Sequence, residues 1–120
     1  MANILGYIRR LFAPRHHQRF MVQNDTIVIL SPGTDNEQNA HVIDISEGGV
    51  AFVYHGSKED LETSGILNML TKNASLEKVN FETVSDKPAT GSYRRRGVKF
   101  DWMGVLKKND LRDFIKSIRI

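Results

Sequence analysis

The sequence predicts a mainly β domain of about six antiparallel strands, closed into a small barrel and followed by one C-terminal helix. Short apolar runs alternate with polar residues, turn-forming residues separate these runs, and the hydrophobic period becomes helical near the end of the chain. A sheet of this size hides its edges most simply by closing on itself. We therefore expect a small antiparallel barrel with one closing helix.

A cationic arm precedes the predicted barrel. A short helix is predicted before Pro14, because one face of that segment is apolar, with Ile4, Ile8, Leu11 and Phe12. Packing on the domain is the favoured role of this helix, and docking to a partner or lying on a membrane surface are the alternatives. No acidic residue occurs before Asp25, whereas four arginines do, at positions 9, 10, 15 and 19. The arm is therefore locally cationic.

The strands are assigned from alternation and from the turns between them. Extended chain is predicted over residues 20–30, 42–52 (a hairpin), 66–70, 76–84 and 93–102. Turns or loops are predicted over residues 31–36, 55–63 and 85–91, which are rich in Gly, Pro, Ser, Asp and Asn. Alternation also splits the run Arg94-Arg95-Arg96 between the two faces of the last strand.

The end of the chain has a helical period. Asn109 is the predicted N-cap, and Asp110 and Asp113 would then lie near the positive end of the helix dipole. An apolar stripe predicts the face that packs on the barrel, and it consists of Leu111, Phe114, Ile115 and Ile118. We expect Trp102 to pack between the barrel and this helix.

The hairpin over residues 42–52 is the most informative stretch. Alternation predicts Ile43 and Ile45 on one face, with Asp44 and Ser46 on the other. Gly48-Gly49 supplies either a positive φ or a bare backbone for the reversal. A carboxylate and a hydroxyl beside such a backbone form a surface on which a flat ligand could rest, although an ordinary hairpin would show the same pattern.

Together these motifs resemble the two-part signature of PilZ domains. The resemblance is carried by Arg15-x-x-x-Arg19 in the arm, Asp44-x-Ser46-x-x-Gly49 in the hairpin and Gly97-Val98-Lys99-Phe100 in the last strand. It implies a PilZ-like β-barrel over residues 15–120, preceded by an N-terminal helix or arm over residues 1–14. PilZ domains bind the bacterial second messenger cyclic di-GMP, so the resemblance also implies this ligand.

The resemblance implies a role for each signature residue. Arg15 and Arg19 would hold the phosphates and stack on or bond to a guanine, which suits the arginine fork. Asp44 would accept from guanine N–H groups, Ser46 would add a hydroxyl, and Gly49 would let the backbone come near. Further contacts are expected from Arg10, Gly48 and Arg96. Because Pro14 stands where binders of two intercalated ligand molecules often have an arginine, we expect a single molecule.

Composition narrows the function classes. The 120 residues suit one domain, and the absence of cysteine excludes disulfides and thiolate metal sites. No membrane span or signal sequence is recognisable, so a cytoplasmic protein is expected. His16 and His17 stand without an acidic or thiol cluster, so no metal site is expected. No nucleophile–base pair or phosphate-binding glycine loop indicates an enzyme, and no cofactor is expected.

Three functions remain open at this point. The favoured one is a module that binds cyclic di-GMP and transmits the signal to an unidentified downstream protein by ordering the N-terminal arm. A PilZ-fold interaction protein that binds no nucleotide is the second. A small-barrel nucleic-acid binder using Tyr93 and the three arginines that follow it is the third. The last is disfavoured, since a net charge of +3 is small and the sheet is poor in aromatic residues, so neither DNA nor RNA is expected as a partner.

Overall fold

The computed structural model describes residues 18–23 and 25–120. The N-terminal helix expected before Pro14 lies outside the described residues. The described elements are, in chain order, β1 (Phe20–Met21), β2 (Ile27–Leu30), β3 (Gln38–Ile45), β4 (Gly49–His55), a 3₁₀ helix (Lys58–Asp60), β5 (Ser64–Leu70), β6 (Ser75–Pro88), β7 (Tyr93–Phe100) and α2 (Val105–Ile118). No helix in this part of the chain is long and apolar enough to cross a membrane.

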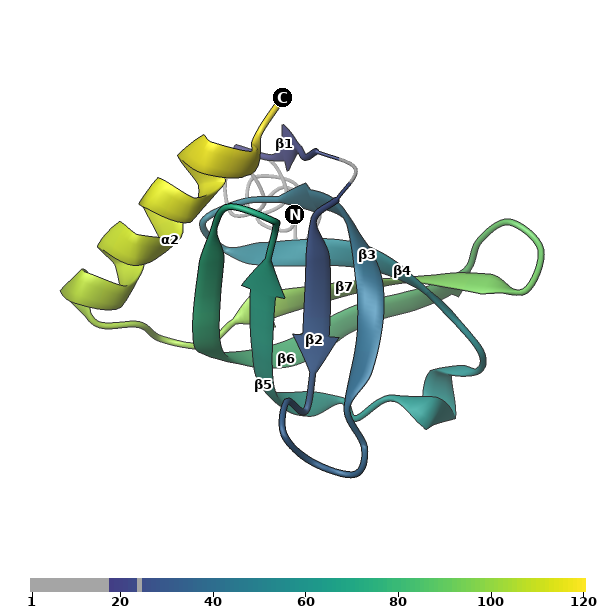
Figure 1. The fold of residues 1–120 in the computed structure, drawn as a ribbon. Coiled ribbons are helices and arrows are strands. Elements are labelled where there is room, and N and C mark those ends of the chain that lie inside the picture. The colour runs from purple at the N-terminus through teal and green to yellow at the C-terminus, as the bar shows by residue number, and fades with distance from the viewer. Residues whose placement is uncertain (1–17, 24) are drawn as a thin grey trace, which may run out of the picture.

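Strands β2 to β7 close into an antiparallel barrel of six strands, as Figure 1 shows. The strands are ordered β3-β2-β5-β6-β7-β4, and pairing of β4 with β3 completes the ring. β1 lies outside the ring and pairs with the end of β3, where Phe20 is opposite Ile45. Closure pairs the backbone groups that an open sheet would leave exposed. The predicted barrel architecture is confirmed.

The core fills the barrel and continues under α2. Its largest fully buried side chains include Phe52, Ile45, Leu67 and Met69. The helix buries the predicted stripe, Leu111, Phe114, Ile115 and Ile118, against one end of the barrel. Each such side chain contributes about 1.5–3 kcal/mol when it is fully buried. The hydrophobic period of the C-terminal segment therefore identified the packed face correctly.

The two ends of the described chain are tied together. The amide of Gln23 donates to the carbonyl of Ile118, and the amide of Ile120 donates to that of Met21, both at 3.0 Å. The guanidinium carbon of Arg119 lies 5.0 Å from the centre of the Phe20 ring, which is a cation–π contact. The segment just after Arg19 is therefore held against the last turn of α2.

Helix α2 starts earlier than the sequence predicts. Gly104 is its N-cap and Asn109 lies within the helix, so the prediction of an Asn109 cap is wrong. The first turn, Val105 to Lys108, contains the good helix formers leucine and lysine, and the amide of Lys108 already donates to the carbonyl of Gly104. Asp110 and Asp113 consequently lie beyond the first turn.

Two further predictions are corrected near the last hairpin. Residues 85–88, expected in a turn, continue β6 and pair with β7, because Asp86 is held by arginines of that strand. Trp102, expected between barrel and helix, has 87% of its surface exposed. It follows the end of β7 and precedes the first turn of α2, so neither element covers it.

Candidate ligand-binding site

A bulge in β3 decides where Asp44 points. Val42 pairs with Phe52 of β4, but Asp44 pairs with the next residue back, Ala51, so Ile43 is the extra residue. Without this bulge, alternation from the buried Ala40 and Val42 would turn Asp44 into the core. With it, Ile45 is buried and Asp44 faces outward. The expected pairing of Ile43 and Ile45 on one face is therefore wrong, whereas the outward aspartate is correct.

The turn from Ser46 to Gly49 is held by the serine itself. Its hydroxyl oxygen accepts from the amides of Gly48 and Gly49 at 3.1 and 3.2 Å, and its own amide donates to the carbonyl of Gly49. Gly49 has no positive φ. A Cβ there would instead overlap the carbonyl of Val98 on β7. Glycine is required at this position for the close approach of β4 to β7.

Small residues form a floor that runs across four strands. Asp44 of β3 pairs with Ala51 of β4, Ala51 with Gly97 of β7, and Gly97 with Ser85 of β6, so all four face the outside of the barrel. A second bulge, at Val84, brings Ser85 into this row. A Cβ on Gly97 would lie 2.8 Å from the Ser85 hydroxyl. The floor is therefore flat and tightly packed.

Three cations surround this floor. Arg95 and Lys99 lie two residues either side of Gly97 on β7, and Arg19 approaches from the arm. A guanidinium nitrogen of Arg95 lies 3.2 Å from a carboxylate oxygen of Asp44, in an ion pair whose arginine side chain is 46% exposed. The floor and these cations border a cavity of about 230 Å³, which we call the outer-face cavity. It is lined by Arg19, Asp44, Ser46, Gly48, Gly49, Val50, Ala51, Val84, Ser85, Arg95, Gly97, Val98 and Lys99.

Most of the expected site residues meet in this cavity. Arg19, Asp44, Ser46, Gly48 and Gly49 all line it, although they come from the arm, β3, the turn and β4. Arg10 and Arg15 lie outside the described residues. The structure adds Arg95, Lys99 and Ser85, which sequence reasoning did not select. Alternation places Arg95 and Lys99 on one face, but it does not tell which face of the strand lies outside.

Arg96, expected to contact the ligand, instead belongs to a buried arginine cluster on the inner face of the barrel. The cluster consists of Tyr54, Asp86, Arg94 and Arg96. Arg96 is 2% exposed, and its Nε donates to Asp86 at 2.7 Å. Its other nitrogens donate to the carbonyls of Lys58 and Glu62 in the connection before β5. These bonds hold Arg96 in place, which corrects its assignment.

The charges of the arginine cluster stabilise one another. Arg94 Nε donates to the second oxygen of Asp86 at 2.5 Å, and the Tyr54 hydroxyl also donates to Asp86. Burial alone would raise the pKa of Asp86, but the hydrogen bonds from Tyr54, Arg96 and Arg94 lower it. The pKa of Tyr54 is raised, first by burial and then by its bond to Asp86. The cluster therefore keeps Asp86 ionised.

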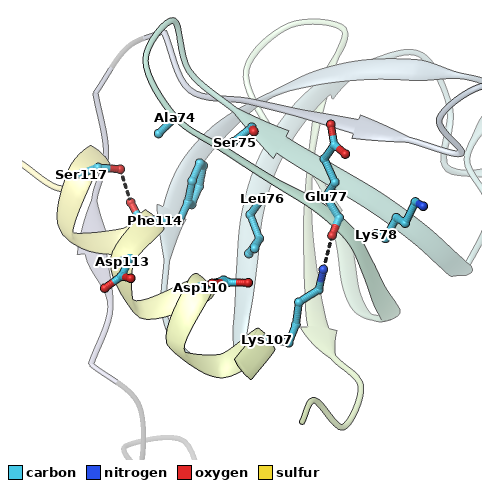
Figure 2. A pocket seen from close by; sticks show the side chains of 10 residues that line it. All are labelled: Ala74, Ser75, Leu76, Glu77, Lys78, Lys107, Asp110, Asp113, Phe114 and Ser117. Carbon is cyan, nitrogen blue, oxygen red and sulfur yellow. Dashed lines mark hydrogen bonds between the residues drawn. The ribbon is translucent and has the colours of Figure 1, made fainter. Parts of the chain in front are cut away.

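A larger pocket lies away from the outer-face cavity, between α2 and β6. The pocket has a volume of about 670 Å³. Figure 2 shows Leu76 and Phe114 inside it and Asp110 and Asp113 on the helix. The Lys107 ammonium donates to the backbone carbonyl of Glu77. Its lining carries three carboxylates and two lysines, so it offers no excess of positive charge to an anionic ligand. Nor do the described residues contain a cluster of His, Cys, Asp or Glu that could hold a metal ion. The outer-face cavity is therefore the candidate site.

These features define a small closed barrel with a flat, cation-lined cavity on its outer face. No protein-family model matches the chain, and no curated protein matches its sequence. Among solved structures, YcgR of Escherichia coli in complex with c-di-GMP matches with a TM-score of 0.69 and 12% identity, over 86% of this chain and 45% of that chain. The K. pneumonia MrkH–c-di-GMP complex matches with a TM-score of 0.69 and 13% identity, over 86% of this chain and 51% of that chain.

A third match is closer in length. The Legionella uncharacterized protein Lpg0364 has a TM-score of 0.57 and 18% identity, over 83% of this chain and 91% of that chain. YcgR and MrkH are PilZ-domain proteins, and this chain has a PilZ-like fold. It spans about half the length of those two neighbours. At these identities the likeness concerns the fold.

Proposed function

We propose that this protein binds cyclic di-GMP in the outer-face cavity. The observation that carries the proposal is the meeting of Arg19, Asp44 and the Ser46–Gly49 turn around one flat floor. Cyclic di-GMP combines flat guanines with two phosphates, so its binder needs a flat surface, a carboxylate and cations together. The complexes of YcgR and MrkH support the choice of ligand, because both have this fold.

Each side chain has a part in this proposal. Asp44 accepts hydrogen bonds from guanine N–H groups, because an ionised carboxylate offers two acceptor oxygens. Arg19 and Arg95 donate to phosphate oxygens or stack on a guanine, and Lys99 adds positive charge. Ser46 shapes the turn, since its hydroxyl oxygen already accepts from two amides. Gly48 lines the cavity beside the floor.

The arm completes the site in the same proposal. Arg15 stands four residues before Arg19, and Arg10 five residues before Arg15. The arm closes over one ligand molecule with Arg15 on the phosphates, and its ordering passes the signal to a downstream protein. The role is ligand binding and regulation, with no catalytic step and no cofactor. Since the ligand is an intracellular messenger, the protein acts in the cytoplasm.

Calorimetric titration with cyclic di-GMP tests the proposal. We expect binding by the wild type, and a roughly 10- to 100-fold loss in Arg19→Ala, because a charge-assisted hydrogen bond contributes about 1.5–3 kcal/mol. Lys87→Ala is the matched control: Lys87 is exposed and pairs across the ladder with Arg95, yet it does not line the cavity. A folded wild type that gives no binding would contradict the proposal and favour an interaction protein without nucleotide.

A further inference from the structure

An exposed apolar patch lies at the start of α2. Trp102, Val105 and Leu106 are 87%, 75% and 81% exposed, and they follow one another within five positions of the chain. Single exposed apolar residues are ordinary, but neighbouring large ones mark a surface that becomes covered. We call these three residues the Trp102 patch.

Trp102, one member of the patch, lines a groove that adjoins the outer-face cavity. This groove of about 360 Å³ runs beside the helix and is lined by residues of the turn, the end of β7 and α2, among them Gly48, Lys99, Trp102 and Leu111. Gly48 and Lys99 line both this groove and the cavity. The turn is also tied to the helix, because Arg112 Nε donates to Glu47 at 2.9 Å. A segment leaving the cavity can therefore follow the groove to the patch.

Residues 3–12 of this chain have the matching chemistry. Their sequence places Ile4, Ile8, Leu11 and Phe12 on one helical face. They precede Arg19, which lines the cavity, by a connection of a few residues. Each extended residue spans up to about 3.5 Å, so residues 13–18 can bridge roughly 20 Å. A segment of this length reaches from the cavity along the groove.

We propose that residues 3–12 dock their apolar face onto the Trp102 patch when the outer-face cavity is occupied by cyclic di-GMP. This inference rests on the proposed function and specifies the surface to which residues 3–12 bind. The arm carries four arginines and no acidic residue, and Arg95 and Lys99 line the cavity, so without ligand the like charges oppose docking. The two phosphates neutralise that charge and hold the arm at the start of the groove. Docking then covers an apolar surface that the empty protein presents.

Trp102 is the single tryptophan of the chain and reports directly on this contact. The experiment measures its fluorescence emission and its quenching by acrylamide in the full chain, with and without cyclic di-GMP, while calorimetry measures binding. Covering an indole shifts its emission to the blue and reduces quenching, so both changes are expected at saturating ligand. Binding without either change would overturn the docking inference and leave the proposed function standing.

Two variants separate docking from a direct effect of guanine on the indole. Ile8→Asp places a charge on the apolar face and should abolish the shift while the ligand still binds. Ala13→Asp adds the same charge away from that face and should keep the shift. A shift that survives Ile8→Asp would overturn the inference, as would a Trp102 that is equally protected before ligand is added. Absence of calorimetric binding would overturn the proposed function itself.

Discussion

The run Arg94-Arg95-Arg96 of β7 supplies one arginine to the outer-face cavity and two to the buried arginine cluster. Arg95 points outward and makes one contact with Asp44, at 3.2 Å, with nearly half of its side chain exposed. Arg94 and Arg96 point inward and share both oxygens of Asp86. Strand alternation alone separates them. An exposed pair exchanges partners at little cost, whereas a buried pair is held by its surroundings.

This difference indicates a division of labour within one strand. The inner arginines tie β7 to β6 and, through the carbonyls of Lys58 and Glu62, to the connection before β5. The outer arginine is free to leave Asp44 for a phosphate, because water and salt already weaken the pair. Stability should therefore depend on the arginine cluster and ligand affinity on the cavity, and substitutions in each should separate the two properties.

The largest expected effect on stability comes from Asp86→Ala. It leaves Arg96 buried without its carboxylate, and breaking a buried pair in this way costs about 3–5 kcal/mol. Urea denaturation followed by circular dichroism measures the loss. Lys87→Ala, the next residue on β6 and exposed, should change stability by less than about 0.5 kcal/mol. Equal stability of the two variants would show that the cluster does not hold the barrel together.

Gly49→Ala should have the next largest effect, and it should affect both properties. The added methyl group would overlap the Val98 carbonyl, so β4 and β7 must separate, at a cost of about 1–3 kcal/mol. Gly104→Ala is the control for the added methyl group, because the nearest atom to its Cβ is 4.0 Å away, and it should lose only the modest N-cap preference for glycine over alanine. Denaturation midpoints and calorimetry compare the two. A Gly49→Ala protein with wild-type stability would contradict the close strand approach.

Asp44→Ala should change ligand selectivity with little change in stability. We expect weaker binding of cyclic di-GMP, by roughly 10-fold or more, because a guanine loses its acceptor. Binding of cyclic di-AMP should be unchanged or tighter, since Asp44 repels phosphate, and adenine N1 is an acceptor where guanine N1 carries a hydrogen that Asp44 can accept. Competition titrations of the two dinucleotides measure the ratio. Equal affinities of the wild type for both would show that Asp44 does not read guanine.

The smallest expected stability effect belongs to Arg95→Ala. An exposed ion pair contributes about 0.2–1 kcal/mol, so the unfolding curve should barely move. If Arg95 transfers to a phosphate, the substitution should still weaken cyclic di-GMP binding when Asp44 is already alanine. A double-mutant cycle tests this. No further loss in the Asp44→Ala background would mean that Arg95 serves Asp44 alone.

Sequence reasoning succeeded where the determinant was local. Alternation and turn residues indicated a closed antiparallel barrel, and the stripe from Leu111 to Ile118 identified the buried helix face. It failed for boundaries: Asn109 is a good cap by composition, but the helix begins at Val105. The turn expected over residues 85–91 instead begins after Pro88. Contacts with other elements outweighed local preference in that strand.

The strand and helix periods, the cationic arm and the residue types of the signature follow from the chain alone, because they depend on neighbours along it. The outward direction of Asp44 required the folded barrel, since that orientation depends on a bulge at Ile43 against β4. The folded barrel also decided that Arg95 lies in the cavity while Arg96 is buried. Which face of a strand becomes the interior is set by the whole barrel, and no local pattern contains it.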